Sequence, residues 1–202
     1  MKNLALPLLT VLLVLFRSGF VLAQSDSNRF ELGAQVAAAT SNQFDANDIG
    51  FGGRFSWNPI KPLGLESEIN FYPNGFPDQV PFSRTRIEGL FGATAGPRFG
   101  AARPFAKVRS GFVSFRPASQ PFACILIFPP PLACQLGGRT LAAFDIGGGV
   151  ELFPAPRIFA RVEAGDRALR YPGPARDHTG ALHQDSFFSH DFRFAAGAGL
   201  RF

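Results

Sequence analysis

The sequence predicts an all-β protein that folds as a closed, antiparallel, up-and-down barrel of eight strands. Three observations support this prediction. Eight segments place an apolar residue at every second position, short and long connectors alternate between them, and the other face of each segment holds mainly glycine and isolated charges. No segment after residue 23 has the spacing of an amphipathic helix, so strands form the whole predicted fold.

The eight segments share one period. Apolar side chains at alternate positions are typical of a strand whose two faces meet different surroundings. The fifth segment is the least regular, and there Ala106, Val108 and Phe112 define the preferred apolar face. The predicted strands are Phe30–Ala38, Ile49–Trp57, Leu63–Phe71, Ile87–Ala95, Ala106–Phe112, Ala142–Leu152, Ile158–Ala164 and Phe192–Phe202.

The connectors differ in length in a regular order. The short ones are rich in Pro or Gly and are Asn58–Pro62, Gly100–Pro104 and Phe153–Pro156. The long ones are Thr40–Asp48, Pro73–Arg84, Arg116–Gly138 and Tyr171–His190. With an even number of strands, all long connectors then lie at one end of the barrel. That layout is typical of a transmembrane barrel with short periplasmic turns and four longer extracellular loops.

The N-terminal segment predicts export. Lys2 precedes the largely apolar stretch Leu4–Phe16, and Val21–Ala23 supplies small residues before a cleavage site. We expect residues 1–23 to be a cleaved signal peptide and residues 24–202 to be the barrel domain; an uncleaved anchor is the alternative. Loss of Lys2 and Arg17 lowers the formal charge from +5 to +3. The chain has no basic run with interleaved aromatics, so we expect no nucleic-acid partner.

Alternation alone does not say which face is inside, because a soluble lipocalin-like barrel turns its apolar face inward. Here the polar face carries matched charges among glycines, which suits a narrow lumen where every charge needs a partner. Ordinary solvated charges on a soluble sandwich are the alternative. The predicted interior charge network is Glu31, Arg54, Glu66, Glu68, Glu88, Arg98, Lys107, Arg109, Asp145, Glu151, Arg161, Glu163, Arg193 and Arg201. For Glu163, we expect Arg193 and Arg201 as partners.

The apolar face then meets lipid. A closed barrel satisfies its backbone groups between strands, so its exterior can be wholly apolar. Aromatic residues at strand ends fit the girdles of such barrels. These are Trp57, Phe71, Phe153 and Phe202.

The last segment is the most specific feature. His190–Phe202 alternates without a break and ends on an aromatic residue. It resembles the terminal strand that the bacterial barrel-assembly machinery recognises, with Phe202 as the terminal aromatic and Phe194 and Leu200 on the same face. The chain resembles the small eight-stranded outer-membrane β-barrel family of OmpA transmembrane domain, OmpX and OmpW type. The resemblance implies location in the cell outer membrane, contact with its lipid and lipopolysaccharide, and the assembly machinery as a partner during biogenesis.

Cys124 and Cys134 lie in the longest connector. An exported protein enters an oxidising compartment, and the chain has two cysteines, so we expect a disulfide between them. The apolar stretch Ile125–Pro131 lies between the two. It could contact lipopolysaccharide or a partner, or fold over the barrel mouth.

The last long connector holds the polar residues that could carry chemistry. Three histidines lie near three aspartates, but their spacing matches no strong metal template, and we interpret them as solvated loop residues. They are His178, His183, His190, Asp177, Asp185 and Asp191. In a hydrolase, Ser186 or Ser189 would be the nucleophile and His190 the base, but the sequence shows no third residue to orient them.

The leading functional hypothesis is a structural or surface-interaction protein of the outer membrane, without cofactor or enzymatic activity. Its interior is closed by paired charges, and its extracellular loops carry specificity. The main rival is a small pore or a conduit for a hydrophobic ligand, as the OmpW type suggests. A third hypothesis is an enzyme that modifies outer-membrane lipid.

Overall fold

The computed structural model describes residues 29–41, 46–73, 85–116, 139–177 and 179–202. These residues form ten strands. They are β1 (Phe30–Ser41), β2 (Ala46–Ile60), β3 (Leu63–Tyr72), β4 (Arg86–Ala95), β5 (Ala102–Phe115), β6 (Thr140–Ala155), β7 (Ile158–Tyr171), β8 (Ala175–Arg176), β9 (Leu182–His183) and β10 (Phe187–Arg201). Within these ranges, the chain contains no helix with the length and hydropathy needed to cross a bilayer.

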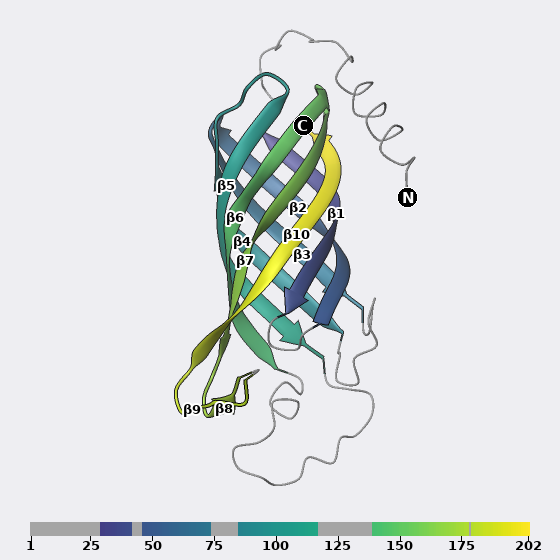
Figure 1. Cartoon of the computed structure of the whole chain (residues 1–202). Coiled ribbons are helices and arrows are strands. Elements are labelled where there is room, and N and C mark those ends of the chain that lie inside the picture. The colour runs from purple at the N-terminus through teal and green to yellow at the C-terminus, as the bar shows by residue number, and fades with distance from the viewer. Residues whose placement is uncertain (1–28, 42–45, 74–84, 117–138, 178) are drawn as a thin grey trace, which may run out of the picture.

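Eight of the strands form a closed antiparallel barrel, as predicted. Each pairs with the next barrel strand along the chain, β7 with β10, and β10 pairs with β1 to close the sheet, with Arg201 opposite Glu31. Closure removes free strand edges, so the backbone donors and acceptors of the wall are satisfied between strands. Figure 1 shows the strands inclined around one axis, and the short hairpin of β8 and β9 lies at one end.

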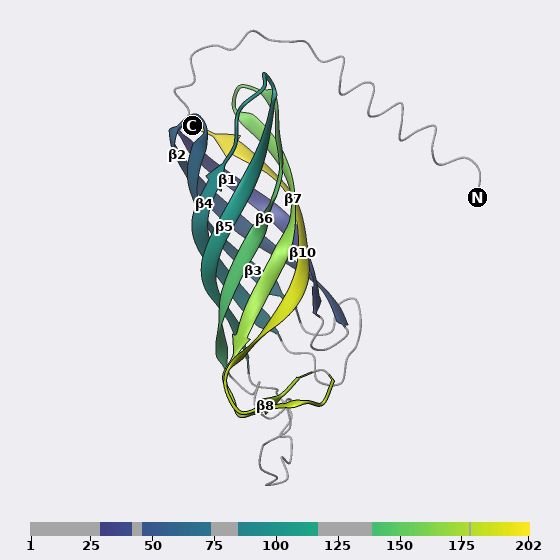
Figure 2. The ribbon, with the colours of Figure 1, turned by 60° about the vertical axis from the view of Figure 1, so that its left-hand side comes forward.

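The two ends of the barrel differ. The connections β2–β3, β4–β5 and β6–β7 lie at the end that carries the C-terminus, which we call the short-turn end (Figure 1). The opposite, long-loop end carries the β8–β9 hairpin, as Figure 2 shows from a second direction. The strands are longer than predicted: β1 runs to Ser41 and β2 begins at Ala46, so most of the predicted connector Thr40–Asp48 is strand. Pairing continues past the apolar belt because backbone groups there also need partners.

The faces of the wall are oriented as the charge pattern predicts. In β5, the Val108 side chain is 62% exposed on the outside, whereas Lys107 and Arg109 are each 1% exposed inside. The parity predicted for this least regular strand is therefore confirmed. The outward apolar face and the inward charged face are the reverse of a soluble lipocalin-like barrel.

The predicted position of one girdle residue is wrong. Phe153 lies on the inner face of β6, where it is 8% exposed, and not on the outside. Its position has the same parity as the inward Glu151, and the strand continues without a break between them. Its aromatic character suggested the outer girdle, but its place in the alternation determines the face.

The lumen is not charged throughout. Towards the long-loop end, inward side chains of β4, β5, β6 and β7 form a buried apolar cluster, against which Phe187 of β10 packs. Its members are Leu90, Val113, Phe115, Leu141, Ala143, Leu169 and Tyr171. The charged side chains thus fill the middle of the lumen and part of each end.

Candidate functional site

The candidate site is the charged interior of the barrel, and strand register builds it. Neighbouring strands place opposite charges directly across from each other on the inner face, as Arg54 faces Glu68 and Arg109 faces Asp145. Cross-strand pairs of opposite charge stabilise a sheet, whereas like charges would repel. The other pairs in direct register are Glu31 with Arg201, Arg103 with Glu151, Arg161 with Glu151, Arg167 with Asp145 and Arg167 with Asp191.

Large charged side chains fit because glycine lies opposite several of them. Gly92 of β4 faces Arg109 of β5, and a Cβ at Gly92 would lie 2.8 Å from the Cγ atom of Arg109. It would also lie 2.1 Å from the carbonyl oxygen of Val108. The glycines of the inner face therefore provide the space that the arginines occupy.

Glu163 of β7 is the centre of the network. Five cations from four strands surround its carboxylate, which is buried. They are Arg54 at 3.5 Å, Lys107 at 2.9 Å, Arg109 at 2.9 Å, Arg161 at 2.6 Å and Arg193 at 3.0 Å. Such charge-assisted contacts are strong where water is excluded, and each of these cations also meets another carboxylate.

Arg109 holds the carboxylates together from the opposite side. Its guanidinium contacts four of them at once, which its planar fork of donors allows and a lysine would not. The distances are 3.1 Å to Glu66, 2.7 Å to Glu68, 2.7 Å to Asp145 and 2.9 Å to Glu163. Arg161 adds a second bridge, with Glu66 at 2.8 Å and Glu151 at 2.9 Å.

The network extends towards the long-loop end. Arg167 contacts Glu88 and, at 2.7 Å, Asp191. The amide of Asn70 donates hydrogen bonds to Glu68 at 2.5 Å and to Glu88 at 2.9 Å, which links this pair to the centre. Beyond them, Arg86 pairs with Asp48 at 2.5 Å.

Towards the short-turn end the ion pairs share fewer residues with one another. Arg103 contacts Glu151 at 3.1 Å, and Arg201 contacts Glu31 at 3.0 Å. Arg98 was predicted on the inner face of the fourth strand, but β4 ends at Ala95, and Arg98 lies in the connection to β5. Its guanidinium stacks on the Phe153 ring at this end of the barrel.

Thirteen of the predicted interior charges are buried, all except Arg98. The expected contact of Glu163 with Arg193 is present, but Arg201 does not reach it and pairs with Glu31. Arg201 and Arg193 are eight positions apart on one strand, which corresponds to about 26 Å along it.

Sequence reasoning missed four buried charges, all on the inner face of a strand. They are Arg86, Arg103, Arg167 and Asp191. Each shares the parity of a predicted interior residue, so continuing the alternation beyond the apolar belt would have found them. Gln35 and Asn70 are neutral members that link charged groups, and their hydrogen bond measures 2.8 Å.

The other predicted residues lie apart from the network. Phe194 in the middle of β10 and Leu200 and Phe202 at its C-terminal end face outward and are exposed. Phe202 stacks on Phe30 with ring centroids 6.1 Å apart. Residues 1–23, Cys124, Cys134 and His178 lie outside the described residues.

The histidines of the last connector pair with separate carboxylates. His183 lies 2.9 Å from Asp177, and His190 lies 2.6 Å from Asp166. Hydrogen bonds from Thr179 and His183 hold the pKa of Asp177 below its usual range. The described residues contain no group of three or more side chains placed to bind a metal ion.

The serines beside His190 do not form a dyad with it in the described geometry. Ser189 is buried on the inner face of β10, whereas His190 is exposed on the outer face of the same strand. Ser186 accepts hydrogen bonds from Arg170.

Comparison with known proteins identifies the fold. No protein-family model matches the chain, and no curated protein matches its sequence. Among solved structures, Neisserial surface protein A has a TM-score of 0.57 at 13% identity, covering 86% of this chain and 97% of the neisserial one. The chain has the fold of a small outer-membrane β-barrel.

Two Pseudomonas aeruginosa structures share this barrel. The N-terminal β-barrel domain of OprF has a TM-score of 0.51 at 11% identity, and the coverage is 87% of this chain and 100% of that domain. The outer membrane protein OprG has a TM-score of 0.50 at 12% identity, with 88% and 97% covered. At these identities the likeness is one of architecture, so the function of this barrel has to be argued from its own residues.

Proposed function

We propose that this protein is an integral protein of the bacterial outer membrane whose barrel is a closed, non-enzymatic support for its long loops. In this proposal residues 1–23 direct export, and the short turns face the periplasm. The long loops contact lipopolysaccharide or a partner at the cell surface. A rigid barrel that carries variable loops is a common way to separate stability from recognition.

The observation that supports a closed interior is the ion-pair network across the lumen. An eight-stranded barrel has an interior just wide enough for side chains to fill it. Here Glu66 of β3 contacts Arg161 of β7 at 2.8 Å, and Arg193 of β10 contacts Glu68 of β3. These contacts run across the lumen between strands that are not neighbours, which supports an interior that is closed by charged side chains.

The outer surface supports insertion into a membrane. Large apolar side chains are exposed around the wall, among them Ile69, Phe91 and Ile146, at about three-fifths exposure each. In water such a continuous apolar surface would favour aggregation, whereas in a bilayer it is the stable arrangement. The folded protein should show the heat-dependent gel shift of a detergent-resistant barrel.

Conductance distinguishes the closed support from a small pore. We expect the purified barrel to show no stable, reproducible open state in a planar bilayer, with a reconstituted porin as positive control. A reproducible open state of the wild-type barrel would favour the pore instead. The hypothesis of a lipid-modifying enzyme is tested by mass spectrometry of lipid A after expression, where we expect an unchanged profile.

Phe202 tests the proposed route of assembly. We propose that the outward residues Phe194, Leu200 and Phe202 form the signal that the assembly machinery recognises. Deletion of Phe202 should then lower the amount of folded barrel in the outer membrane. The change Phe99→Ala removes a comparably exposed aromatic at the same end and is the matched control. Equal surface levels of the deletion and the control would contradict this role.

A further inference from the structure

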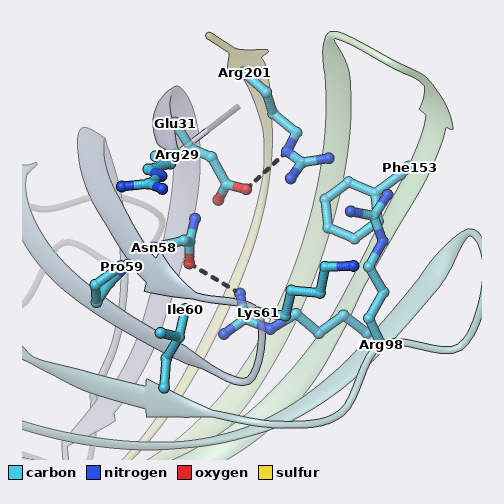
Figure 3. A pocket seen from close by; sticks show the side chains of 10 residues that line it. Arg29, Glu31, Asn58, Pro59, Ile60, Lys61, Arg98, Phe153 and Arg201 are labelled. Carbon is cyan, nitrogen blue, oxygen red and sulfur yellow. Dashed lines mark hydrogen bonds and ion pairs between the residues drawn. The ribbon is translucent and has the colours of Figure 1, made fainter. Parts of the chain in front are cut away.

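The short-turn end of the barrel contains a cavity of about 320 Å³. This volume is at the lower end of the range for small-molecule sites, so it suits a small ligand or a headgroup. The cavity is lined by Arg29, Glu31, Asn58, Pro59, Ile60, Lys61, Arg98, Arg103, Phe153 and Arg201. Figure 3 shows the side chains of Glu31, Lys61, Arg98 and Arg201 arranged around it. We call this cavity the basic mouth.

The basic mouth has an excess of positive charge. Among the described residues that line it, five are cations, Arg29, Lys61, Arg98, Arg103 and Arg201, and one is a carboxylate, Glu31. That carboxylate is already held by Arg201 at 3.0 Å. Arg103 is paired with Glu151, which does not line the cavity, so the mouth has fewer carboxylates than cations among its described lining residues. Like charges gathered around an open space repel each other, and an anion between them relieves the repulsion.

Arg103 provides an independent indication of a ligand. The residue is 4% exposed. Only its Nη1 atom donates hydrogen bonds to described residues, to Glu151 at 3.1 Å and to Asn58 at 3.2 Å. Its Nε and Nη2 atoms are buried and have no hydrogen-bond acceptor among the described residues. A buried guanidinium that leaves donors unsatisfied is costly, and an acceptor in the cavity that it lines would satisfy them.

The ring of Phe153 holds two further guanidinium groups by stacking. The Cζ atoms of Arg98 and Arg201 lie 4.2 Å and 4.4 Å from the centroid of its ring. Stacking on an aromatic ring restricts each guanidinium, so less freedom is lost when an anion binds. The inward position of Phe153, unexpected from the sequence, therefore contributes directly to the cavity.

We propose that the basic mouth binds a phosphate group. The cations come from different parts of this end of the barrel, namely the residue before β1, the β2–β3 turn, the β4–β5 connection, β5 and the end of β10. A planar carboxylate presents its acceptors in one plane, whereas a phosphate presents oxygens in several directions and carries more charge. Guanidinium forks match phosphate oxygens in pairs. Lys61 and Arg29 are exposed at the rim of the cavity, where they add positive charge without holding the anion in a defined orientation.

The binding site follows from this geometry alone, and only its location on the periplasmic side depends on the proposed function. The phosphate group can belong to a soluble periplasmic anion or to the headgroup of an anionic phospholipid. Titration calorimetry of the folded full chain in an uncharged detergent separates the two. One titration uses sodium phosphate, and the other uses short-chain phosphatidylglycerol with phosphatidylcholine of equal chain length as reference.

The variants for this test are chosen among the residues that line the basic mouth. The double change Lys61→Gln and Arg98→Gln removes two charges without touching the buried network, and the gel shift checks that the barrel still folds. We expect the Kd of the bound probe to rise about tenfold or more, as expected for the loss of two charges near the anion. Arg157→Gln is the matched control, because Arg157 is exposed in the β6–β7 turn at the same end but does not line the cavity. If the double variant fails to fold, Lys61→Gln alone is used.

Each outcome is decisive. Saturable one-site binding of phosphate that the double variant loses and Arg157→Gln retains supports the site and assigns it to a soluble anion. Binding of phosphatidylglycerol alone, with the same response to the variants, supports the site and assigns it to a lipid headgroup. No saturable binding of either probe, or equal weakening by Arg157→Gln, would overturn the proposal. A barrel that conducts ions yet still binds phosphate would contradict the proposed function and leave this site intact.

Discussion

The arginines in the middle of the lumen and those at the basic mouth differ in their surroundings rather than in their chemistry. Arg109 and Arg193 are fully buried, and carboxylates contact each of them on more than one side. Arg29 and Lys61 are exposed and have no ion-pair partner within the described part of the chain. Position along the barrel axis therefore separates Arg109 and Arg193, which stabilise the fold, from Arg29 and Lys61, which are available to a ligand.

The free energies of the two groups should differ in the same way. A charge in a water-poor interior is expensive to leave alone, so removing its partner destabilises the protein strongly. A charge at a wet mouth is screened, and its removal costs little. Substitutions at the two places test this difference directly.

The largest effect is expected at the centre of the network. Glu163→Leu leaves five cations short of a carboxylate and should lower the free energy of unfolding by about 3–5 kcal/mol. Urea unfolding in micelles measures it, followed by the fluorescence of Trp57, the single tryptophan. The outward neighbour is the control, because Val162→Leu at an exposed apolar position should stay within about 0.5 kcal/mol. If Val162→Leu unfolds early and Glu163→Leu does not, the network does not stabilise the barrel.

A smaller loss is expected where the network needs space. Gly92→Ala places a methyl group against the Arg109 side chain and the Val108 carbonyl, and should cost about 1–3 kcal/mol. The matched variant is Gly53→Ala on the outer face, where the nearest atom to a new Cβ is 3.7 Å away. We expect no loss of stability in the same urea experiment for Gly53→Ala. Equal stability of the two alanine variants would show that the lumen can rearrange around an added methyl group.

At the basic mouth the effect on stability should be small. Lys61→Gln removes an exposed charge and should change the free energy of unfolding by less than about 0.5 kcal/mol. The same variant should weaken phosphate binding, so that stability and binding respond to different residues. A loss of stability close to that of Glu163→Leu would mean that the mouth belongs to the same structural network.

The smallest effect is expected at the long-loop end. Reduction of the predicted Cys124–Cys134 disulfide should leave the heat-dependent gel shift unchanged, because ladder hydrogen bonds hold the barrel wall without it. The experiment compares the oxidised protein with protein treated with a thiol reductant. Loss of the shift on reduction alone would show that this loop is part of the fold.

The sequence by itself determined the barrel and its two faces. Alternation is a local property, so the parity of Lys107 and Arg109 followed from their immediate neighbours, and the matched charges identified the inner face. The same rule failed where residue type was weighed above position. Phe153 was placed outside because it is aromatic, and Arg167 was left out because it follows the last apolar position of its predicted strand. Asp191 was interpreted as a solvated loop residue because of the histidines near it, but it is buried on the inner face of β10.

Only the tertiary structure decided which charges meet. Contacts such as Arg193 with Glu68 and Arg161 with Glu66 join residues 125 and 95 positions apart, across the lumen and between strands that are not neighbours. They depend on the tilt and stagger of the closed sheet, which alternation along one strand does not encode. The basic mouth has the same origin, because strand ends, turns and one inward aromatic ring come together there after the barrel closes.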